Sequence, residues 1–232
     1  MRASAIAQPN IALIKYWGKR DIERNLPAVG SISITLRDLF TEMDVELDAG
    51  CETDMLLVNG AVDEAMLPRL SACLDAVVGR DRARARISSR CNFPIAAGLA
   101  SSASAFASIT VAAAHATGKP LDTAGLANLA GQCSGSAARS LYGGFVELES
   151  RENDVRVRTL RDGSEWPLVV VVAVTEKGPK PVGSTEAMEI SRKTSPFYSS
   201  WIEKQNEDLA LARDAIEARD FQKLAAVAEH NC

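Results

Sequence analysis

The stretch from Pro94 to Gly118, PIAAGLASSASAFASITVAAAHATG, constrains the fold more than any other part of this 232-residue chain. Gly98 precedes two serines, and the residues that follow are mostly alanine and other small side chains. Alanine has the highest helix propensity, and small side chains let a helix approach a sheet closely. The pattern predicts a buried helix that begins near Ser101 or Ser102 and packs on a β-sheet.

The start of this helix has two interpretations, and the stretch alone leaves both open. Ser101 or Ser102 can cap the helix, because a hydroxyl oxygen satisfies a free N–H group of the first turn. Alternatively, the backbone N–H groups from Leu99 to Ser102 can bind an anion, since Gly98 permits close approach and the helix dipole favours negative charge. The second serine can then offer its hydroxyl to a phosphate-bound metal ion. The Gly-Lys-Ser/Thr ending of a Walker loop is absent.

Composition and charge exclude several classes of function. The chain has 47% apolar and 24% charged residues, as ordinary globular proteins do, and a net charge of −4. Such a chain has no general attraction to nucleic acid or to an anionic membrane, so an anionic ligand requires a local cluster of basic groups. Five cysteines without a C-x-x-C pair argue against a disulfide framework or a zinc site and fit a reducing cytoplasm. Because His115 and His230 are the only histidines, a histidine triad or multi-histidine metal site is not expected.

Hydrophobic periodicity predicts an alternation of strands and helices over the first two thirds of the chain. A tight hairpin turn is expected at Asn59-Gly60, and Asp122 or Thr123 is expected to cap a helix. Strands are predicted at 11–14, 31–36, 41–50, 56–62, 83–93, 143–150 and 155–160, and helices at 63–79, from 101 onwards and at 123–132.

The last third of the chain predicts one strand and then helices. PLVVVVAV (Pro167 to Val174) is too short to span a bilayer and is typical of a buried strand that begins a second subdomain. Ser184 or Thr185 resembles a capped helix start, and helical spacing continues to Cys232. Apolar stripes on helices need a surface to cover, and a single strand is too little. We therefore expect the chain to end before its second domain is complete.

A basic, aromatic segment follows the apolar residues 11–14. Lys15 and Lys19 in IKYWGKRD can neutralise a phosphorylated or carboxylated substrate, while Tyr16 and Trp17 can exclude water. Taken alone, the segment is also compatible with a surface turn that carries solvated charges.

Two further loops favour anions. In GQCSGSAARSLYGGF, Ser134, Gly135 and Ser136 present hydroxyl and amide donors, and Arg139 can bind two oxygens of a carboxylate or phosphate. In KGPKPVGSTEAM, two lysines precede a glycine and a helix start. Each loop alone fits a glycine-rich turn or a helix cap, but four such loops in one acidic chain indicate a site for an anionic ligand.

Several motifs resemble a known family. PIAAGLASSA is similar to the P-x-x-x-G-L-x-S-S-A phosphate loop of the GHMP kinases. The motifs NIALIKYWGKRD, NLPAVGSISITL, SGSAARSLYGGFVE and GSTEAM follow the order of the diphosphomevalonate decarboxylase branch. The resemblance implies an α+β GHMP kinase fold. It implies a ribosomal-protein-S5-like N-terminal domain at 1–165 with the ATP site, and the start of a ferredoxin-like C-terminal domain at 166–232.

The resemblance also implies the reaction. Family members use ATP and Mg²⁺ to phosphorylate the 3-hydroxyl of 5-diphosphomevalonate, and loss of phosphate and CO₂ gives isopentenyl diphosphate. A phosphomevalonate decarboxylase, a mevalonate 3-kinase relative and a non-catalytic nucleotide-binding module are the alternatives. The family's catalytic aspartate lies in a D-A-G-P-N-like motif that the 232 residues do not contain, so we expect it beyond Cys232. A cytoplasmic homodimer without nucleic-acid or membrane partners is implied.

The site residues carry over position by position from the resemblance. Lys19 and Arg139 are implied to be catalytic, with Arg139 on the departing carboxylate, and Ser102 is implied to contact Mg²⁺. Thr185 is implied to contact the substrate diphosphate. The ATP phosphates are implied to be held by Ala97, Gly98, Leu99, Ala100, Ser101, Ser102 and Ala103. The substrate is implied to contact Tyr16, Trp17, Gly18, Lys19, Ser134, Gly135, Ser136, Ala137, Ala138, Arg139 and Thr185.

Overall fold

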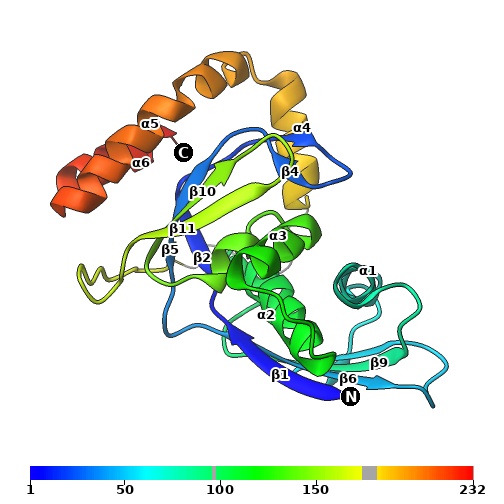
Figure 1. Cartoon of the computed structure of the whole chain (residues 1–232). Coiled ribbons are helices and arrows are strands. Elements are labelled where there is room, and N and C mark those ends of the chain that lie inside the picture. Colours follow the sequence, from blue (N-terminus) through cyan, green and yellow to red (C-terminus); the bar gives the residue numbers. More distant parts are fainter. Residues whose placement is uncertain (96–97, 174–181, 232) are drawn as a thin grey trace.

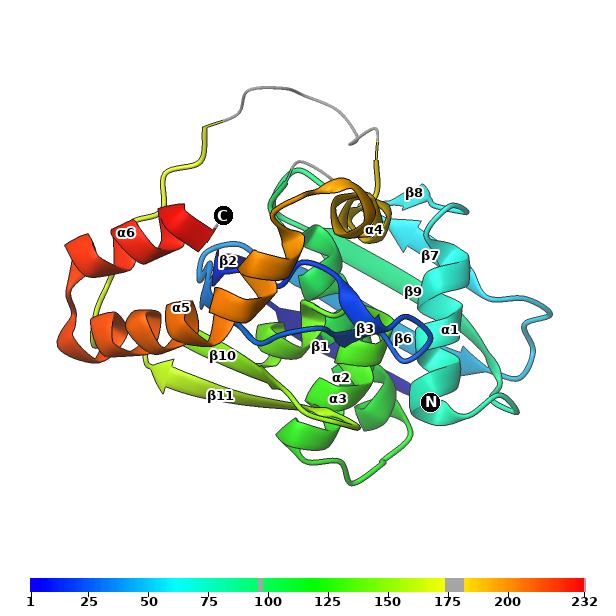
Figure 2. The ribbon, with the colours of Figure 1, turned by 90° about the horizontal axis from the view of Figure 1, so that it is seen from above.

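Figure 1 shows a computed structural model of the chain, which describes residues 1–95, 98–173 and 182–231. A β-sheet lies at the bottom of this view, helices cover its upper face, and a second sheet and the C-terminal helices lie above. Figure 2, seen from above, shows the second sheet between the central helices and the C-terminal helices.

The first sheet is built from strands that alternate apolar and polar side chains. In β6 (Thr41–Asp48), Met43, Val45 and Leu47 are buried, and the residues between them are partly exposed. Side chains of a strand alternate between faces, so one face of this sheet is apolar and the other is polar. The strand order is β1-β6-β9-β7-β8, with β1 at Arg2–Ala7, β7 at Met55–Val58, β8 at Ala61–Val62 and β9 at Arg84–Cys91.

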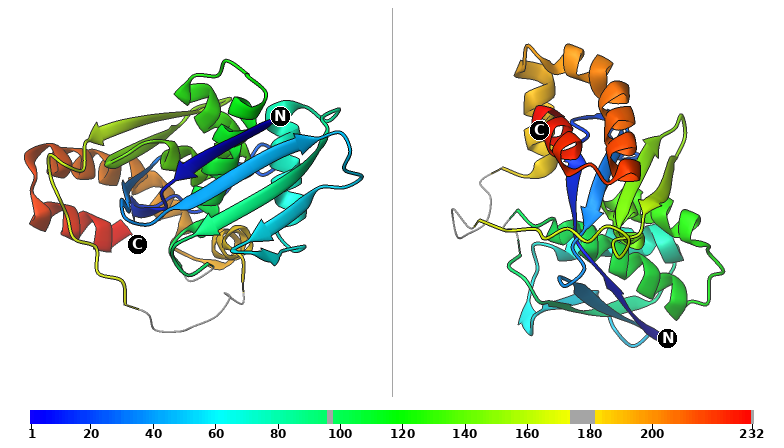
Figure 3. Two further views of the ribbon diagram at one scale, coloured as in Figure 1. Left: turned by 90° about the horizontal axis from the view of Figure 1, so that it is seen from below. Right: turned by 90° about the vertical axis from the view of Figure 1, so that its left-hand side faces the viewer.

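The alanine-rich helix covers the apolar face of this sheet, as predicted. α2 (Ser101–Ala116) lies against β1 and β6, and most of its side chains are buried. The small side chains bring its axis close to the strands, while Phe106 and Ile109 fill the remaining space. α1 (Leu67–Val78) packs beside it. Within the described part of the chain, no helix covers the opposite, polar face, which faces the viewer in Figure 3, left.

The second sheet has four antiparallel strands in the order β11-β10-β5-β2. It connects to the first layer through α3 (Thr123–Cys133) and the short 3₁₀ helix η1 (Ala137–Leu141), both of which contact α2. A small ribbon, β3 (Lys19–Asp21) with β4 (Leu26–Pro27), stands between β2 and β5 in the chain. The strands of the second sheet are β2 at Asn10–Ile14, β5 at Ser31–Thr35, β10 at Phe145–Ser150 and β11 at Val155–Arg161.

The C-terminal helices cover the second sheet, contrary to the expectation that their apolar stripes need a sheet from a further domain. α5 (Tyr198–Ala218) and α6 (Phe221–Asn231) pack against each other and against β2. Leu209 and Ile216 of α5 share one hydrophobic cluster with Ile32 and Phe145 of the sheet. Only the expectation that no sheet within the described residues could cover these helices was wrong: α5 packs on the face of the second sheet that carries Ile32 and Phe145, and sequence periodicity does not show what a helix will cover.

The predicted buried strand at Pro167 to Val174 was also wrong for the residues described. Residues 167–173 adopt no regular structure, and the side chains of Val169 and Val171 are 91% and 87% exposed. A strand needs a neighbour for its backbone N–H and C=O groups, and no described strand lies beside this segment. Val174 lies outside the described residues.

The sequence also predicted one tight turn and two helix caps, and the structure confirms the turn and one of the caps. Asn59 and Gly60 both have positive φ in the turn between β7 and β8, and the Asp122 side chain accepts a hydrogen bond from Gly125 N at 2.7 Å to cap α3. Both predictions are confirmed. α4 (Ser184–Thr194) begins after Gly183 without a side-chain cap, so the expected cap by Ser184 or Thr185 is absent.

Replacing Ile216 by alanine tests whether α5 belongs to the cooperative core. Ile216 is 1% exposed against the second sheet, so Ile216→Ala is expected to lower the free energy of unfolding by about 2–5 kcal/mol in urea denaturation. Leu211, on the same helix but 37% exposed, is the matched control, and Leu211→Ala is expected to cost less than about 1 kcal/mol. Equal losses would show that α5 does not stabilise the fold through this contact.

Candidate active site

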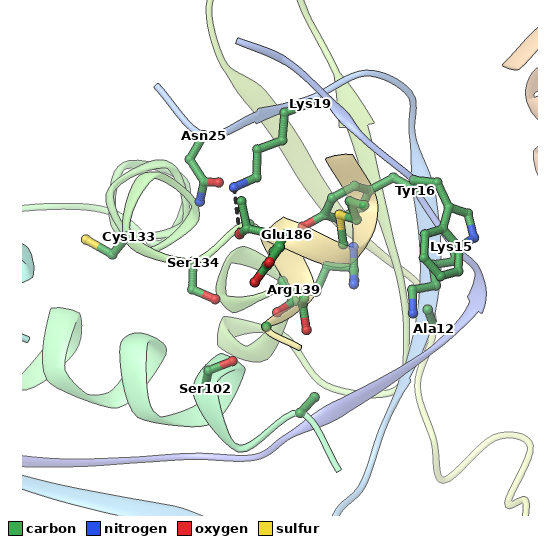
Figure 4. A pocket seen from close by; sticks show the side chains of 18 of the residues that line it. Ala12, Lys15, Tyr16, Lys19, Asn25, Ser102, Cys133, Ser134, Arg139 and Glu186 are labelled. Carbon is green, nitrogen blue, oxygen red and sulfur yellow. Dashed lines mark hydrogen bonds between the residues drawn. The ribbon is translucent and has the colours of Figure 1, made fainter. Parts of the chain in front are cut away.

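A cleft of about 990 Å³ brings together residues from distant parts of the sequence. Its walls come from the loop after β2, from Arg69 of α1, from the start of α2, from the end of α3 with η1, and from the start of α4. Figure 4 shows Lys19, Ser102, Ser134 and Arg139 around the same space. The four anion-favouring loops predicted from the sequence therefore meet, as far as they lie in the described residues.

Arg139 lies at the floor of the cleft and is 3% exposed. Its Nε donates to Ser33 Oγ at 3.0 Å, and its Nη1 donates to Ser31 Oγ. Nε and Nη2 both donate to Asn10 Oδ1 at 3.3 Å. These acceptors are neutral, and no carboxylate within residues 1–95, 98–173 and 182–231 pairs with this guanidinium. Burial lowers the pKa of Arg139, and Tyr16 partly opposes this effect.

Asn10 holds Arg139 and was not found by the sequence analysis. Its side chain is 3% exposed, and its Nδ2 donates to Ser136 O at 3.1 Å and Ser140 Oγ at 2.8 Å. One amide therefore fastens both ends of η1 to β2 while its oxygen accepts from Arg139. A polar residue at the start of an apolar strand was the only signal in the sequence, and it has no specific meaning by itself.

A second cationic group lies near the mouth of the cleft. Lys19 Nζ donates to Thr185 Oγ1 at 3.1 Å, which joins β3 to the first turn of α4. Partial burial lowers the pKa of Lys19, the charge of Arg69 lowers it further, and Glu189 raises it. Arg69 lines the same cleft, with its guanidinium carbon 4.7 Å from the ring centroid of Phe106. Sequence analysis missed Arg69, because one arginine on an amphipathic helix usually marks a solvated face.

Two glycines allow aromatic rings to pack closely in the site. The Tyr16 ring is 7% exposed, lies 5.9 Å from the Arg139 guanidinium, and has its pKa raised by burial. A Cβ at Gly135 would lie 2.3 Å from the Tyr16 hydroxyl oxygen. Gly18 has a φ of +90°, and a Cβ there would lie 2.3 Å from the Tyr198 hydroxyl oxygen. A side chain at Gly135 would displace the Tyr16 ring, which lines the cleft, and a side chain at Gly18 would displace the Tyr198 ring of α5.

The start of α2 has a geometry that favours an anion and not a side-chain cap. The N-cap residue is Ala100 in the left-handed region, with a φ of 53°, and no side chain caps the helix. The interpretation of Ser101 or Ser102 as the cap is therefore wrong. Gly98 has a φ of +89°, and nothing lies within 4 Å of a Cβ built on it, so the backbone faces open space. An alanine in the left-handed region costs about 1–3 kcal/mol, which is typical of a functional backbone conformation.

The predicted site residues fall into three groups. Ala97, Lys177 and Lys180 lie outside the described residues. Ala103, Ala137 and Ala138 are completely buried, and neither they nor Gly18, Leu99 and Ser101 line the cleft. The predicted residues that line the cleft are Tyr16, Trp17, Lys19, Gly98, Ala100, Ser102, Ser134, Gly135, Ser136, Arg139 and Thr185.

Fold and cleft define an α+β protein of the GHMP kinase class. The family model for the diphosphomevalonate decarboxylase-like N-terminal domain matches residues 7–158, and that for the mevalonate 5-diphosphate decarboxylase C-terminal domain matches residues 170–231. The chain belongs to the diphosphomevalonate decarboxylase family.

Curated relatives agree with this membership. Diphosphomevalonate decarboxylases of Gibberella zeae, Candida albicans and Homo sapiens are 35%, 37% and 37% identical over 97%, 96% and 94% of this chain. The matches cover 65%, 67% and 60% of the relatives, so the chain spans about two thirds of their length.

Solved structures confirm the expected fold. The structure described as "MDDEF in complex with MVAPP, AMPPCP and Magnesium" has a TM-score of 0.87 and 31% identity, covering 100% of this chain and 72% of that one. The mevalonate diphosphate decarboxylase of Staphylococcus aureus has a TM-score of 0.85 and 37% identity with the same coverage. Among the described residues, none of the helices is long and apolar enough to cross a membrane.

The environment of Lys19 predicts its titration. Its pKa is lowered by burial and by Arg69, so an NMR titration of the Lys19 side chain is expected to have a midpoint below 10.5. Arg69→Gln is expected to raise this midpoint, and Glu189→Gln is expected to lower it. The unfolded chain then holds this proton to higher pH than the folded chain, so stability rises with pH between the folded midpoint and 10.5.

The resonance of Lys19 is assigned by its loss in Lys19→Arg. A midpoint at or above 10.5 in the wild type would contradict the described environment.

Proposed function

We propose that this chain binds 5-diphosphomevalonate and MgATP and takes part in the ATP-dependent decarboxylation that yields isopentenyl diphosphate, ADP, phosphate and CO₂. The observation that carries the proposal is the buried guanidinium of Arg139, which has neutral partners only among the described residues and borders the cleft. The relatives' names support decarboxylation of diphosphomevalonate, and one solved structure is described with MVAPP, AMPPCP and magnesium.

The floor of the cleft suits a carboxylate. A guanidinium has five N–H donors. Asn10, Ser31 and Ser33 engage Nε and one donor on each terminal nitrogen of Arg139, which leaves one N–H on each terminal nitrogen. Two such donors can bind both oxygens of a carboxylate, and the interaction is strong where water is excluded. We assign the carboxylate of diphosphomevalonate to this position.

The mouth of the cleft suits the diphosphate group. Lys19 and Thr185 are already hydrogen-bonded to each other, and Arg69 lies close enough to affect the pKa of Lys19. Lys19 and Arg69 can form ion pairs with a diphosphate, and the Thr185 hydroxyl can donate a hydrogen bond to it. Ser134 and Ser136 line the same cleft, and we assign their hydroxyls to the middle of the substrate.

The start of α2 suits the nucleotide phosphates. The uncapped helix start, the open backbone at Gly98 and the Ser102 hydroxyl all face the cleft. Among the described residues, no group of three or more His, Cys, Asp and Glu side chains is placed to hold a metal ion. Mg²⁺ therefore fits as an ion held mainly by phosphate oxygens with Ser102 as a protein ligand, and when bound it neutralises charge on the transferred phosphoryl group.

The proposed reaction uses these assigned positions. The terminal phosphoryl group of ATP passes to the 3-hydroxyl of the substrate, ADP leaves, and the hydroxyl proton passes to the catalytic aspartate that the family resemblance implies. Departure of the new phosphate then leaves an electron-poor carbon. The bond from the neighbouring carbon to the carboxylate then breaks, its electron pair forms the new double bond, and CO₂ leaves. Arg139 keeps the carboxylate in place until this step, and Tyr16 above it excludes water. Lys19 stabilises anionic oxygens of the substrate.

Other sequence predictions stay predictions. They are the division of the chain at residue 165, the homodimer, the cytoplasmic location and the individual residue roles.

The test is to measure ADP and CO₂ formed from ATP and 5-diphosphomevalonate by the wild type and by Arg139→Gln. Loss of a buried charge-assisted contact is expected to cost about 2–4 kcal/mol, or about thirty- to thousandfold in turnover. Affinity for the ATP analogue AMPPCP with Mg²⁺, measured by titration calorimetry, is expected to stay within about twofold, because Arg139 is assigned to the substrate carboxylate and not to the nucleotide phosphates.

Arg156→Gln on exposed β11 is the matched control, and wild-type turnover is expected for it. An Arg139→Gln protein with wild-type turnover would remove Arg139 from the mechanism. A wild-type chain that binds neither ligand would overturn the proposed function.

A further inference from the structure

Gln205 is a completely buried polar side chain outside the cleft. It lies on α5, and its Nε2 donates to two backbone carbonyls, Lys15 O at 3.1 Å and Gly30 O at 2.8 Å. Carbonyl oxygens only accept hydrogen bonds, so these neighbours fix the orientation of the amide. Both donors of the amide are used, and both go to segments that lead into the site.

Asn231 completes the contact from α6. Its Nδ2 donates to Gln205 Oε1 at 2.9 Å and to Asp208 Oδ2 at 2.8 Å, and its Oδ1 accepts from Lys15 N at 2.9 Å. The backbone N–H and C=O of Lys15 are thus both bound by side chains of the C-terminal helices. The two amides satisfy the backbone N–H and C=O of Lys15, as a neighbouring strand would within a sheet.

The two carbonyls mark the place where two strands separate. β2 and β5 pair as far as Ile14 and Ile32. Beyond this point Lys15 leads into Tyr16–Lys19, and Gly30 precedes Ser31, whose hydroxyl accepts from Arg139. The Gln205 amide therefore bridges the loop that carries Lys19 and the strand that supports Arg139.

Tyr198, two turns before Gln205 on α5, makes a second contact between this helix and the Lys15–Lys19 loop. Its hydroxyl donates to Trp17 O at 3.0 Å, and its ring fills the space beside Gly18. Residues seven apart lie on one face of a helix, so Tyr198 and Gln205 contact successive parts of the loop. In Figure 2 this part of α5 runs beside β2 and β3.

We propose that Gln205 is a positioning residue for the substrate site: its amide sets the spacing between the Lys15–Lys19 loop and the strand segment that holds Arg139. This inference rests on the proposed function for the identity of the ligand. Gln205 contacts no ligand itself. It acts by holding two backbone carbonyls at a fixed separation, and through them the groups assigned to the two ends of diphosphomevalonate.

The test compares Gln205→Met with Gln222→Met. Methionine keeps the length of the side chain but removes both donors, and Gln222 is an exposed glutamine on α6. Amide hydrogen exchange of the folded proteins is expected to be at least about tenfold faster at residues 15–19 in Gln205→Met and unchanged in Gln222→Met. Unchanged exchange at 15–19 in Gln205→Met would overturn the proposal.

Ligand affinity separates positioning from a general loss of stability. The Kd for 5-diphosphomevalonate is expected to rise about tenfold in Gln205→Met, whereas the Kd for AMPPCP with Mg²⁺ stays within about twofold, because the hydrogen bonds of Gln205 go to Lys15, Gly30 and Asn231 and not to the residues assigned to the nucleotide. Equal rises for both ligands would mean that Gln205 only stabilises the fold, and the proposal would be wrong.

A second variant tests the proposal if Gln205→Met does not fold. Tyr198→Phe keeps the ring and removes only the hydrogen bond to Trp17 O, so a smaller rise with the same preference for diphosphomevalonate is expected. The absence of such a preference would overturn the proposal. If the wild type does not bind diphosphomevalonate, the proposed function fails, and hydrogen exchange at residues 15–19 alone decides whether Gln205 positions the loop.

Discussion

The guanidinium of Arg139 is the charge around which the site is organised. Moving such a cation out of water costs several kcal/mol unless its hydrogen bonds are replaced and an opposite charge is supplied. Ser31 and Ser33 stand on the same face of β5, two residues apart, and Asn10 stands on the neighbouring strand β2. The second sheet thereby supplies the hydrogen bonds but no negative charge within the described residues. A bound anionic ligand would supply the negative charge that pairs with Arg139.

The surrounding structure keeps this arrangement rigid. Asn10 ties η1 to β2, Gly135 lets the Tyr16 ring lie close to Arg139, and α5 holds the backbone of the Tyr16–Lys19 loop. The chain carries a net charge of −4, yet the cleft gathers four cations, Lys15, Lys19, Arg69 and Arg139, against three carboxylates, Glu23, Glu186 and Glu189. Local placement of cations, together with the open start of α2, makes the cleft attractive to anions although the whole molecule is acidic.

The features that the sequence predicted are those with local causes. The α2 helix follows from alanine content, the Asn59-Gly60 turn from positive φ, and the Asp122 cap from one side chain that reaches its own helix. The loops around the cleft were found because several charged and small residues stand together in each. Family resemblance then joined these loops into one site.

The failures have non-local causes. Valine-rich residues 167–173 have the composition of a strand, but a strand also needs a partner, which composition cannot reveal. α5 and α6 were expected to need a further sheet because nothing in their spacing points to β5 and β10. Asn10, Arg69 and Gln205 are single polar residues in ordinary strand and helix patterns, and their roles depend on partners far away in the chain.

The most direct measurement is a crystal structure of the chain with 5-diphosphomevalonate bound. The account predicts that both carboxylate oxygens lie about 2.7–2.9 Å from the terminal nitrogens of Arg139, with the diphosphate near Lys19 and Thr185. A ligand bound in the reverse orientation, or a carboxylate that makes no contact with Arg139, would contradict it.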